Sequence, residues 1–451
     1  MIKGRSKNYI FQNDILRYES LANEFTPEIY KEFDIKADKL DLTSKIDDLF
    51  NGKVVNLTEN QAALHPQYRS YGSNNISIPK CLIDAEVKAE EFSKILSLCY
   101  KKTNKVVNII TLGIGGSYEG PKLLLECLNH PICSELYDQQ KINFDFVTGS
   151  DPKEFDFKLR FLDPKNTFFI VSSKSFTTDE TIETLNRALD WSDDNEKFLA
   201  ITSNPEKAKK HGIKRVVIFD KEIGGRYSIW SPITQFHLCG DNYRDAFERG
   251  GHQADIDLQE DQEYLNFLKK LSFSDIWMNN IKGINTRAIL SYEWNLRSLP
   301  DYFQQLEMES LGKLANPNSE FNKTGQIIFG GFGPRAQHSY FQLLHQGTQD
   351  ICADIIANKE DPKSLSYAQA LIQSTLFSNG AKDLQKQERI NGNVPINLFL
   401  LNKIDPYTLG YLIATWEHRV FITATMLEIN PFDQFGVIAG KKFVREFFKD
   451  S

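Results

Sequence analysis

The sequence lacks several features that would assign it to large classes of protein. No stretch of its 451 residues approaches 18 consecutive apolar residues, which is about the length that a membrane-spanning helix needs. Residues 1–11 carry charges but no apolar stretch, so we expect no signal peptide. Basic residues are not in excess, because 60 acids against 53 bases give a net charge of −7. A membrane protein and a nucleic-acid binder are therefore both disfavoured.

Cysteine pairs and nucleotide-binding motifs are also missing. The six cysteines, at positions 81, 99, 127, 133, 239 and 352, show no C-x-x-C spacing, so reduced thiols in a cytoplasmic protein are predicted rather than disulfides or a zinc site. A G-x-G-x-x-G motif would need glycine at Tyr118, and Pro121 interrupts a Walker pattern. We expect no metal and no cofactor.

What the sequence does contain is an alternation of short apolar runs with helical patterns, which predicts an α/β fold with central parallel sheets covered on both faces. Five predicted strands come first, at residues 106–112, 143–147, 167–172, 198–202 and 215–219. A second block follows, with a helix near 271–311, a strand at 326–329, a helix from 336, a strand at 351–356, a helix near 364–378, a strand at 396–401 and a long helix from about 405.

This order predicts two similar α/β sandwiches. The expected boundaries are a mostly helical N-terminal arm over residues 1–85, a first domain over 86–240, a polar connection over 241–270, and a second domain with a C-terminal helix over 271–451.

The most informative motif is the run Ser173-Lys174-Ser175-Phe176-Thr177-Thr178, where a predicted strand gives way to the acidic helix start at residues 179–180. A helix N-terminus offers unpaired N–H groups and the positive end of a dipole, so this corner suits a phosphate group. The simpler alternative is a capping box between Thr177 and Glu180. A cap would explain one hydroxyl but not the three polar residues upstream.

Two glycine-rich turns are further candidates. Gly113-Ile114-Gly115-Gly116-Ser117 follows a predicted strand, and its glycines would let the backbone approach a ligand, although a tight turn alone could also require them. Gly224-Gly225-Arg226-Tyr227-Ser228 could present a guanidinium to an open site, or could be an exposed surface turn.

Single polar residues in the second block are weaker candidates. Gln305 and Glu309 are four apart in a helical pattern that Gly312 would end, so they share a face. Such a glutamate is more often solvated and inert. His338 lies near a predicted helix start, seven residues before His345, and could equally be a packing residue.

Together these segments resemble the glucose-6-phosphate isomerase family, in a short bacterial form, over about residues 50–445. The matching stretches are 58–59 with 64–65, 113–117 with 120–121, 173–178 with 180–181, 224–228, 308–310 with 312–313, 337–338 with 342–347, and 432–437 with 440–441. The resemblance implies a pair of sugar-isomerase (SIS) domains and a metal-independent enzyme that interconverts glucose 6-phosphate and fructose 6-phosphate through ring opening and a cis-enediol. It also implies a homodimer, with the histidine reaching the site from the partner subunit.

The resemblance also implies roles for individual residues. Glu309 matches the base that moves a proton between C2 and C1, and Arg226 matches the cation that stabilises the enediolate. His338 and Lys441 match the ring-opening pair. The substrate-binding matches are Gly116, Ser117, Ser173, Lys174, Ser175 and Thr178 for the phosphate, and Gln305 and Gln434 for the sugar.

The chemistry accounts for these residue types. One base on one face of a planar enediol is sufficient for aldose–ketose isomerisation. The charge on the intermediate needs a fixed cation, and arginine keeps its proton. Ring opening needs proton transfer near neutral pH, which suits a histidine.

Three departures from the family pattern stand out. Leu311 replaces a usual asparagine, residues 330–335 read Gly-Gly-Phe-Gly-Pro-Arg in place of a Gly-Glu-Pro-Gly-Thr type of loop, and Val437-Ile438 stands where an acid is usual. The altered loop leaves two alternatives open: a sugar-phosphate-sensing regulator without catalysis, and an isomerase that also accepts mannose 6-phosphate.

Overall fold

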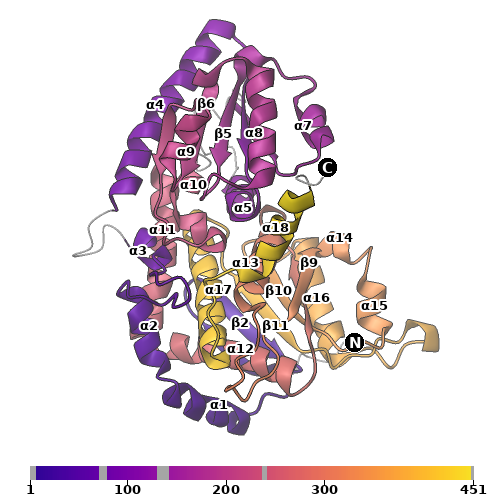
Figure 1. Cartoon of the computed structure of the whole chain (residues 1–451). Helices are drawn as coiled ribbons and strands as arrows, with labels where there is room; N and C mark the ends of the chain where they lie inside the picture. The colour runs from indigo at the N-terminus through magenta and orange to yellow at the C-terminus, as the bar shows by residue number, and fades with distance from the viewer. Residues whose placement is uncertain (1–6, 71–78, 129–141, 236–240, 448–451) are drawn as a thin grey trace. The chain divides into compact units, whose positions relative to one another are not determined.

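The computed structural model describes residues 7–70, 79–128, 142–235 and 241–447 (Figure 1). The chain divides into two compact units. Residues 64–249 form what we call the inserted unit, and residues 1–63 together with 250–451 form the flanking unit.

The inserted unit contains a five-stranded sheet in the order β4-β3-β5-β6-β7, and all its strand pairs are parallel. Every residue of β3, β5 and β6 is buried, so these strands are continuous apolar runs, as expected for a sheet covered on both faces. The strands are β3 (Val107–Leu112), β4 (Ile142–Val147), β5 (Thr167–Ser172), β6 (Phe198–Thr202) and β7 (Arg215–Ile218).

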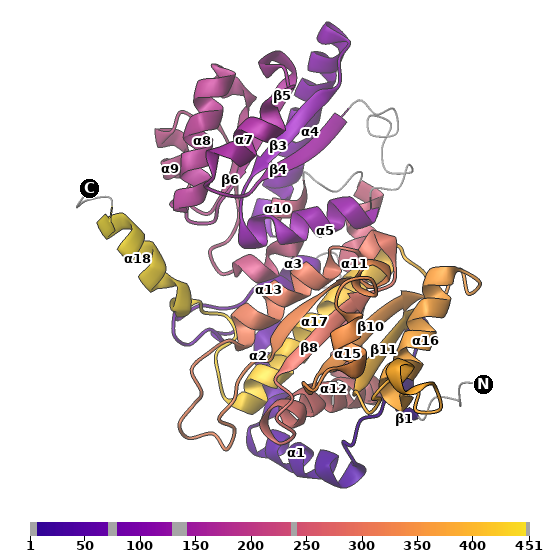
Figure 2. The ribbon, with the colours of Figure 1, turned by 90° about the vertical axis from the view of Figure 1, so that its right-hand side faces the viewer.

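Helices cover both faces of this sheet (Figure 2). α7 (Pro152–Leu159), α8 (Asp179–Ser192) and α9 (Pro205–Lys210) pack on one face around Ile110 and Val171. α4 (Lys80–Thr103) and α10 (Pro232–Gln235) pack on the other face, around Ile109 and Ile170. The short helices α3 (His65–Arg69) and α5 (Glu119–Leu128) complete the described helices of this unit, together with the first part of α11 (Asp241–Glu260).

The flanking unit contains a six-stranded sheet in the order β1-β2-β11-β10-β8-β9. Its last four strands are parallel, and the N-terminal hairpin extends it through an antiparallel pairing of β2 with β11. The strands are β1 (Lys7–Gln12), β2 (Leu16–Leu21), β8 (Thr286–Ser291), β9 (Ile327–Phe332), β10 (Cys352–Asn358) and β11 (Ile396–Leu401).

Successive residues of these strands point to opposite faces, and each face has its own helices. Leu398 and Ile355 join a core with α14 (Gly333–Ala336), α15 (Phe341–Gln346) and α16 (Leu365–Asn379). Phe399 contacts Trp416 of α17 (Pro406–Leu427) on the opposite face, where α12 (Gln262–Asn280) and α13 (Leu299–Leu311) also pack. The remaining helices of this unit are α1 (Pro27–Lys39), α2 (Leu42–Phe50) and α18 (Ile438–Phe447).

Local sequence explains where the central helix of this unit begins and ends. Asp405 caps α17 by accepting a 2.8 Å hydrogen bond from the backbone N–H of Thr408, and Pro406 occupies the first helical position. Glu428, in a left-handed conformation at φ 56°, ends the helix. From Thr408 to Leu427 every residue is buried, so α17 is the core helix against which α12 and α13 pack.

The predicted α/β class with two parallel-stranded sheets is confirmed, but several elements differ from the prediction. β8 lies inside the segment predicted as one helix over 271–311, because a short buried apolar run such as residues 286–291 resembles a helix segment in periodicity. The N-terminal hairpin β1–β2 was not expected. The predicted connection over 241–270 is helical, formed by α11 and the start of α12, and the predicted arm over 1–85 is divided between the two units.

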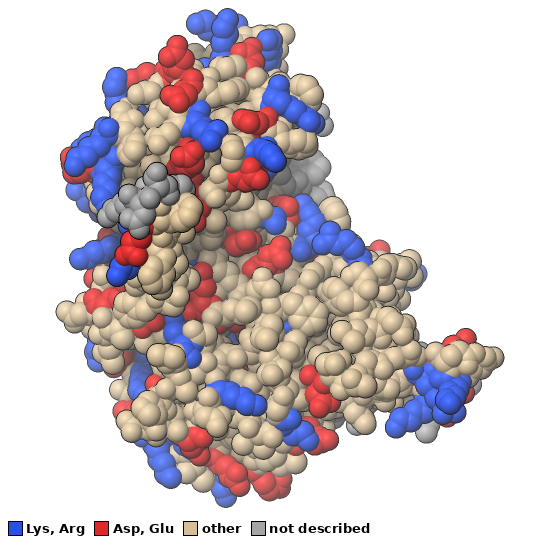
Figure 3. Space-filling view, turned by 45° about the vertical axis from the view of Figure 1, so that its right-hand side comes forward, with Lys and Arg blue, Asp and Glu red and all other residues tan. Residues whose placement is uncertain are grey.

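Three composition-based expectations concern the whole chain. The four described cysteines, Cys81, Cys99, Cys127 and Cys352, are free thiols, whereas Cys133 and Cys239 lie outside the described residues. Among the described helices, none is long and apolar enough to cross a bilayer. Basic and acidic side chains are intermingled on the face drawn in Figure 3.

Candidate active site

In the inserted unit, the hydroxyl-rich run forms the loop between β5 and α8. Phe176 adopts a left-handed conformation at φ 52° and buries its ring in the core beneath the loop. Ser173 is also buried, whereas Lys174 is partly exposed and Ser175 is exposed. The loop therefore alternates between residues that anchor it and residues available to a ligand.

Hydrogen bonds fix the backbone of this loop. The carbonyl of Lys174 accepts bonds from the Thr202 hydroxyl at 3.0 Å, the Ser203 hydroxyl at 2.7 Å and the Ser203 N–H at 3.0 Å. The hydroxyls of the loop pair with one another, Ser173 with Thr178 at 3.3 Å and Ser175 with Thr177 at 2.7 Å. The pair of Ser173 and Thr178 leaves one hydroxyl proton that a phosphate oxygen could accept.

The capping-box interpretation of this run is wrong. The N-cap of α8 is Thr178, one residue later than expected, and it makes no side-chain capping bond. Thr177 is instead held by Ser175. Phe176, in its left-handed conformation, lies two residues before this N-cap.

The two glycine-rich turns of the inserted unit are in direct contact. A Cβ atom on Gly116 would lie 1.9 Å from the carbonyl oxygen of Gly225, so only glycine fits there. The Ser228 hydroxyl contacts the carbonyls of Gly225 at 2.7 Å and Gly116 at 3.2 Å. Gly115 needs its flexibility too, because its φ is 60°.

This contact places Arg226 beside the loop that carries Ser117. Arg226 is only 2% exposed, so the alternative of an exposed surface turn is wrong. Its guanidinium carbon lies 5.6 Å from the Tyr227 ring centroid. Both turns and the hydroxyl loop follow strands of one parallel sheet at its carboxyl edge, which is where α/β proteins bind ligands.

In the flanking unit, α13 carries Glu309 in its last turn. The helix ends at Gly312, as predicted, and the Gly312 N–H bonds to the Met308 carbonyl. The Glu309 side chain is partly buried, and its Oε1 accepts hydrogen bonds from the amides of Gln305 at 3.3 Å and Gln434 at 3.0 Å. The Glu309 carboxylate is therefore oriented by two hydrogen bonds and is not an inert surface group.

A buried charge network sits on the opposite side of the same helix. Glu307 pairs with Arg287, and its other oxygen accepts a 2.7 Å bond from the Trp416 indole. Arg287 also pairs with Asp275 at 2.5 Å. Burial raises the pKa of the Glu307 carboxyl, and the arginines oppose that rise. Two residues of helix correspond to about 200°, so Glu307 facing the core places Glu309 on the open side.

The structure leaves His338 exposed. It follows α14, its N–H bonds to the Arg335 carbonyl at 3.1 Å, and the imidazole has no side-chain partner among the described residues. The predicted helix from residue 336 is broken, since α15 begins only at Phe341. His345 therefore does not share a helix face with His338, and instead bonds to Gln373 at 2.9 Å and stacks on Phe377.

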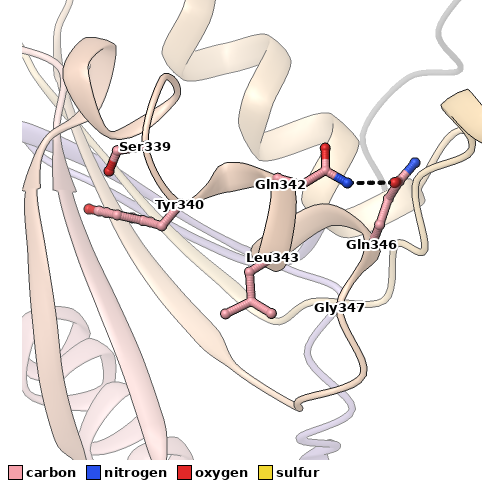
Figure 4. A pocket seen from close by; sticks show the side chains of 6 residues that line it. All are labelled: Ser339, Tyr340, Gln342, Leu343, Gln346 and Gly347. Carbon is pink, nitrogen blue, oxygen red and sulfur yellow. Dashed lines mark hydrogen bonds between the residues drawn. The ribbon is translucent and has the colours of Figure 1, made fainter.

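A shallow pocket of about 550 Å³ is lined by residues that follow His338 in the chain (Figure 4). Two of them, Gln342 and Gln346, are joined by a 2.7 Å hydrogen bond. The lining residues are Ser339, Tyr340, Gln342, Leu343, Gln346 and Gly347.

Lys441 lies in α18, whose residues are all exposed. Gln434, at the other end of this segment, precedes a 3-10 turn and is the residue that reaches Glu309. Within the flanking unit the structure thus brings Gln305 and Gln434 to Glu309, and it leaves His338 and Lys441 open to solvent.

Comparison with known proteins identifies the family. The model of the phosphoglucose isomerase family matches residues 21–450. This chain is 34% identical over 427 residues to a glucose-6-phosphate isomerase of Legionella pneumophila strain Paris, covering 91% of this chain and 84% of the relative. It is also 34% identical over 493 residues to one of Shewanella putrefaciens, covering 96% and 89%. The chain belongs to the phosphoglucose isomerase family. The predicted family and the predicted isomerase class are thereby confirmed.

The fold agrees with a solved phosphoglucose isomerase. A glucose-6-phosphate isomerase structure from Chlamydia trachomatis superposes with a TM-score of 0.83, covering 98% of this chain and 89% of that one. Its sequence identity is 23%, so this likeness supports the fold only.

The contacts of several residues around the phosphoglucose isomerase motifs could not be predicted from the sequence. Asp433 is buried and bonded to Lys313 and Thr58, and Glu307 belongs to the buried network. The matching motifs at 58–59, 312–313 and 432–437 contain three of these residues, but only the folded chain pairs them.

Proposed function

We propose that this chain catalyses the reversible isomerisation of glucose 6-phosphate to fructose 6-phosphate, the reaction for which its family is named, through ring opening and a cis-enediol. The observation that carries the mechanism is the Glu309 carboxylate, whose Oε1 is held by Gln305 and Gln434. Two amide donors on one oxygen orient the carboxylate for proton transfer at a single face of a planar intermediate.

The 6-phosphate is bound by the inserted unit. Ser117, Ser173, Lys174, Ser175 and Thr178 supply hydroxyls and one ammonium, and Gly116 lets the backbone approach. The fixed Lys174 carbonyl supports this role, because donors that are already ordered cost little entropy when they bind, and the N-terminus of α8 follows the loop directly.

Arg226 stabilises the charge of the enediolate. It is buried, and a guanidinium keeps its proton throughout, so it offers a fixed cation in surroundings of low dielectric constant. Gln305 and Gln434 line the sugar while holding Glu309.

His338 and Lys441 open the ring, and His338 acts in the site of a partner subunit within a homodimer. The exposed imidazole and the shallow pocket lined by residues that follow it in the chain support this assignment, as does the family resemblance. Mixing two inactive variants, Glu309→Gln and His338→Gln, should restore part of the activity, since exchange of subunits would create one intact site per mixed dimer. No recovery after proven exchange would contradict a histidine acting across subunits.

We place the enzyme in the cytoplasm, where hexose phosphates are made and consumed by glycolysis and gluconeogenesis. The free thiols of the described cysteines are consistent with that compartment.

A coupled assay tests the function directly. Fructose 6-phosphate is supplied with a metal chelator present, and glucose 6-phosphate is measured through a dehydrogenase. We expect turnover that Glu309→Gln abolishes. Absence of turnover would favour the regulator alternative, and comparable turnover of mannose 6-phosphate would favour the alternative of an isomerase that accepts both sugars.

A further inference from the structure

A buried ion pair joins the two segments of the flanking unit that carry Glu309 and Gln434. The Lys313 ammonium lies 3.0 Å from Oδ1 of Asp433, with side chains 13% and 9% exposed, and it also donates to the backbone carbonyl of Asp433. Because both charges are largely removed from water, removing one partner leaves the other uncompensated.

Thr58 holds the second oxygen of the same carboxylate. Its hydroxyl donates to Oδ2 of Asp433 at 2.8 Å and accepts a 2.7 Å bond from the Asn430 amide. The same hydroxyl has a longer contact of 3.3 Å to Asn56. A hydroxyl has one proton, and its contact with the Asp433 carboxylate is shorter than its contact with Asn56, so the proton is donated to Asp433. Thr58 and Asp433 are 375 residues apart, which makes this a tertiary contact and not a local turn.

These contacts connect the chain segment that carries Glu309 to the segment that carries Gln434. Lys313 follows Glu309 by four residues, just beyond the end of α13, and Asp433 directly precedes Gln434. The two segments are thus linked twice, by Lys313 with Asp433 and by Glu309 with Gln434 at 3.0 Å. Gln434 itself is exposed. Without a fixed backbone, breaking its hydrogen bond to Glu309 would therefore cost little free energy, because the side chain would gain conformational entropy in water.

We propose that Lys313, Thr58 and Asp433, the C-terminal clamp, are positioning residues that hold the Gln434 amide against Glu309. The inference rests on the proposed function, since its effect is on the orientation of the base. The clamp belongs to the flanking unit and includes none of the residues assigned to the phosphate, so we expect it to affect kcat more than KM.

Steady-state kinetics on fructose 6-phosphate tests the clamp with Asp433→Asn, Gln434→Ala and the double variant. Asp433→Asn keeps the shape and removes the charge. We expect a kcat lower by about 10- to 100-fold, with KM within about twofold, because small misplacements of a reacting group cost that much. In the Gln434→Ala background, Asp433→Asn should change kcat by less than about twofold, since residues acting through one another are not additive.

A matched lysine separates positioning from loss of stability. Lys269→Met removes an ion pair of similar length between α12 and α1, in which the lysine, with its side chain 11% exposed, lies 2.8 Å from Asp34, whose side chain is 36% exposed. We expect both Lys313→Met and Lys269→Met to lower the melting temperature, and only Lys313→Met to lower kcat. If Lys313→Met does not fold, Thr58→Val removes one clamp contact with little change of shape and should lower kcat in the same direction.

The outcomes distinguish the two proposals. The clamp would be refuted if the kcat of the double variant fell by the product of the factors for Asp433→Asn and Gln434→Ala, or if the variants raised KM and left kcat unchanged. Either result would leave the proposed isomerase activity intact. An inactive wild-type chain, or an active Glu309→Gln variant, would overturn the proposed mechanism and with it the clamp.

Discussion

The two units of the chain build their share of the chemistry in different ways. In the inserted unit the candidate residues lie on loops at one edge of a parallel sheet, and backbone hydrogen bonds fix them, as at the Lys174 carbonyl. In the flanking unit a side chain, Glu309, is held by the amide of Gln305, which is 4 residues away in the chain, and by that of Gln434, which is 125 residues away. Binding a constant group such as phosphate suits a rigid backbone cradle, whereas proton transfer depends on a few side chains whose orientation tertiary contacts must set.

The largest effect is expected at the base. Glu309→Gln removes the proton acceptor and keeps an oxygen for the two amides, so kcat should fall by about 100- to 10,000-fold, the usual contribution of general acid–base catalysis. Calorimetric binding of fructose 6-phosphate should change little, because the phosphate residues belong to the other unit. A variant with near-normal kcat would refute the assignment.

Arg226→Ala should rank second and would test whether the inserted unit does more than bind. Loss of the cation that stabilises the enediolate should lower kcat by about 100- to 1,000-fold, with a smaller change in KM. The opposite pattern, a raised KM at constant kcat, would make Arg226 a residue of ground-state binding and leave catalysis to the flanking unit alone.

Gly116→Ala should disturb the contact between the two glycine-rich turns of the inserted unit. Its Cβ would lie 1.9 Å from Gly225, so the two turns must separate, at a cost of about 1–3 kcal/mol typical of overpacking. We expect a raised KM for fructose 6-phosphate and a lower melting temperature. Gly436→Ala is the matched control in the flanking unit, because nothing lies within 4 Å of its Cβ, and equal effects of both would contradict the argument.

The smallest effect is expected on the pH dependence of stability, through His345. Burial lowers the pKa of His345, so the folded state stays neutral where the unfolded chain takes up a proton. This stability is present above the ordinary histidine pKa of about 6.5 and is lost as pH falls below it. Melting temperatures between about pH 7.5 and 5.5 should fall less steeply for His345→Gln than for the wild type, and equal slopes would refute the assignment.

Local chemistry in the sequence is enough to predict much of the inserted unit. Its five strands can be placed to within a residue or two, since continuous runs of β-branched and aromatic residues are typical of buried strands in parallel sheets. Residues 173–178 stand out by their density of hydroxyls at a strand-to-helix corner, and the family resemblance locates Glu309, Gln305 and Gln434. The capping box fails because nothing in the residue pattern shows that Phe176 turns left-handed.

By itself, then, the sequence determined the fold class, the family and the set of reacting residue types, because periodicity and motif spacing are local properties of the chain. Only the tertiary structure decided which polar side chains meet. Glu307 finds Arg287 and Trp416, and Asp433 finds Lys313 and Thr58, across as many as 375 residues. The sequence does not show whether a charged residue is solvated or buried. Its burial with a partner depends on the packing of strands and helices that are distant in the chain.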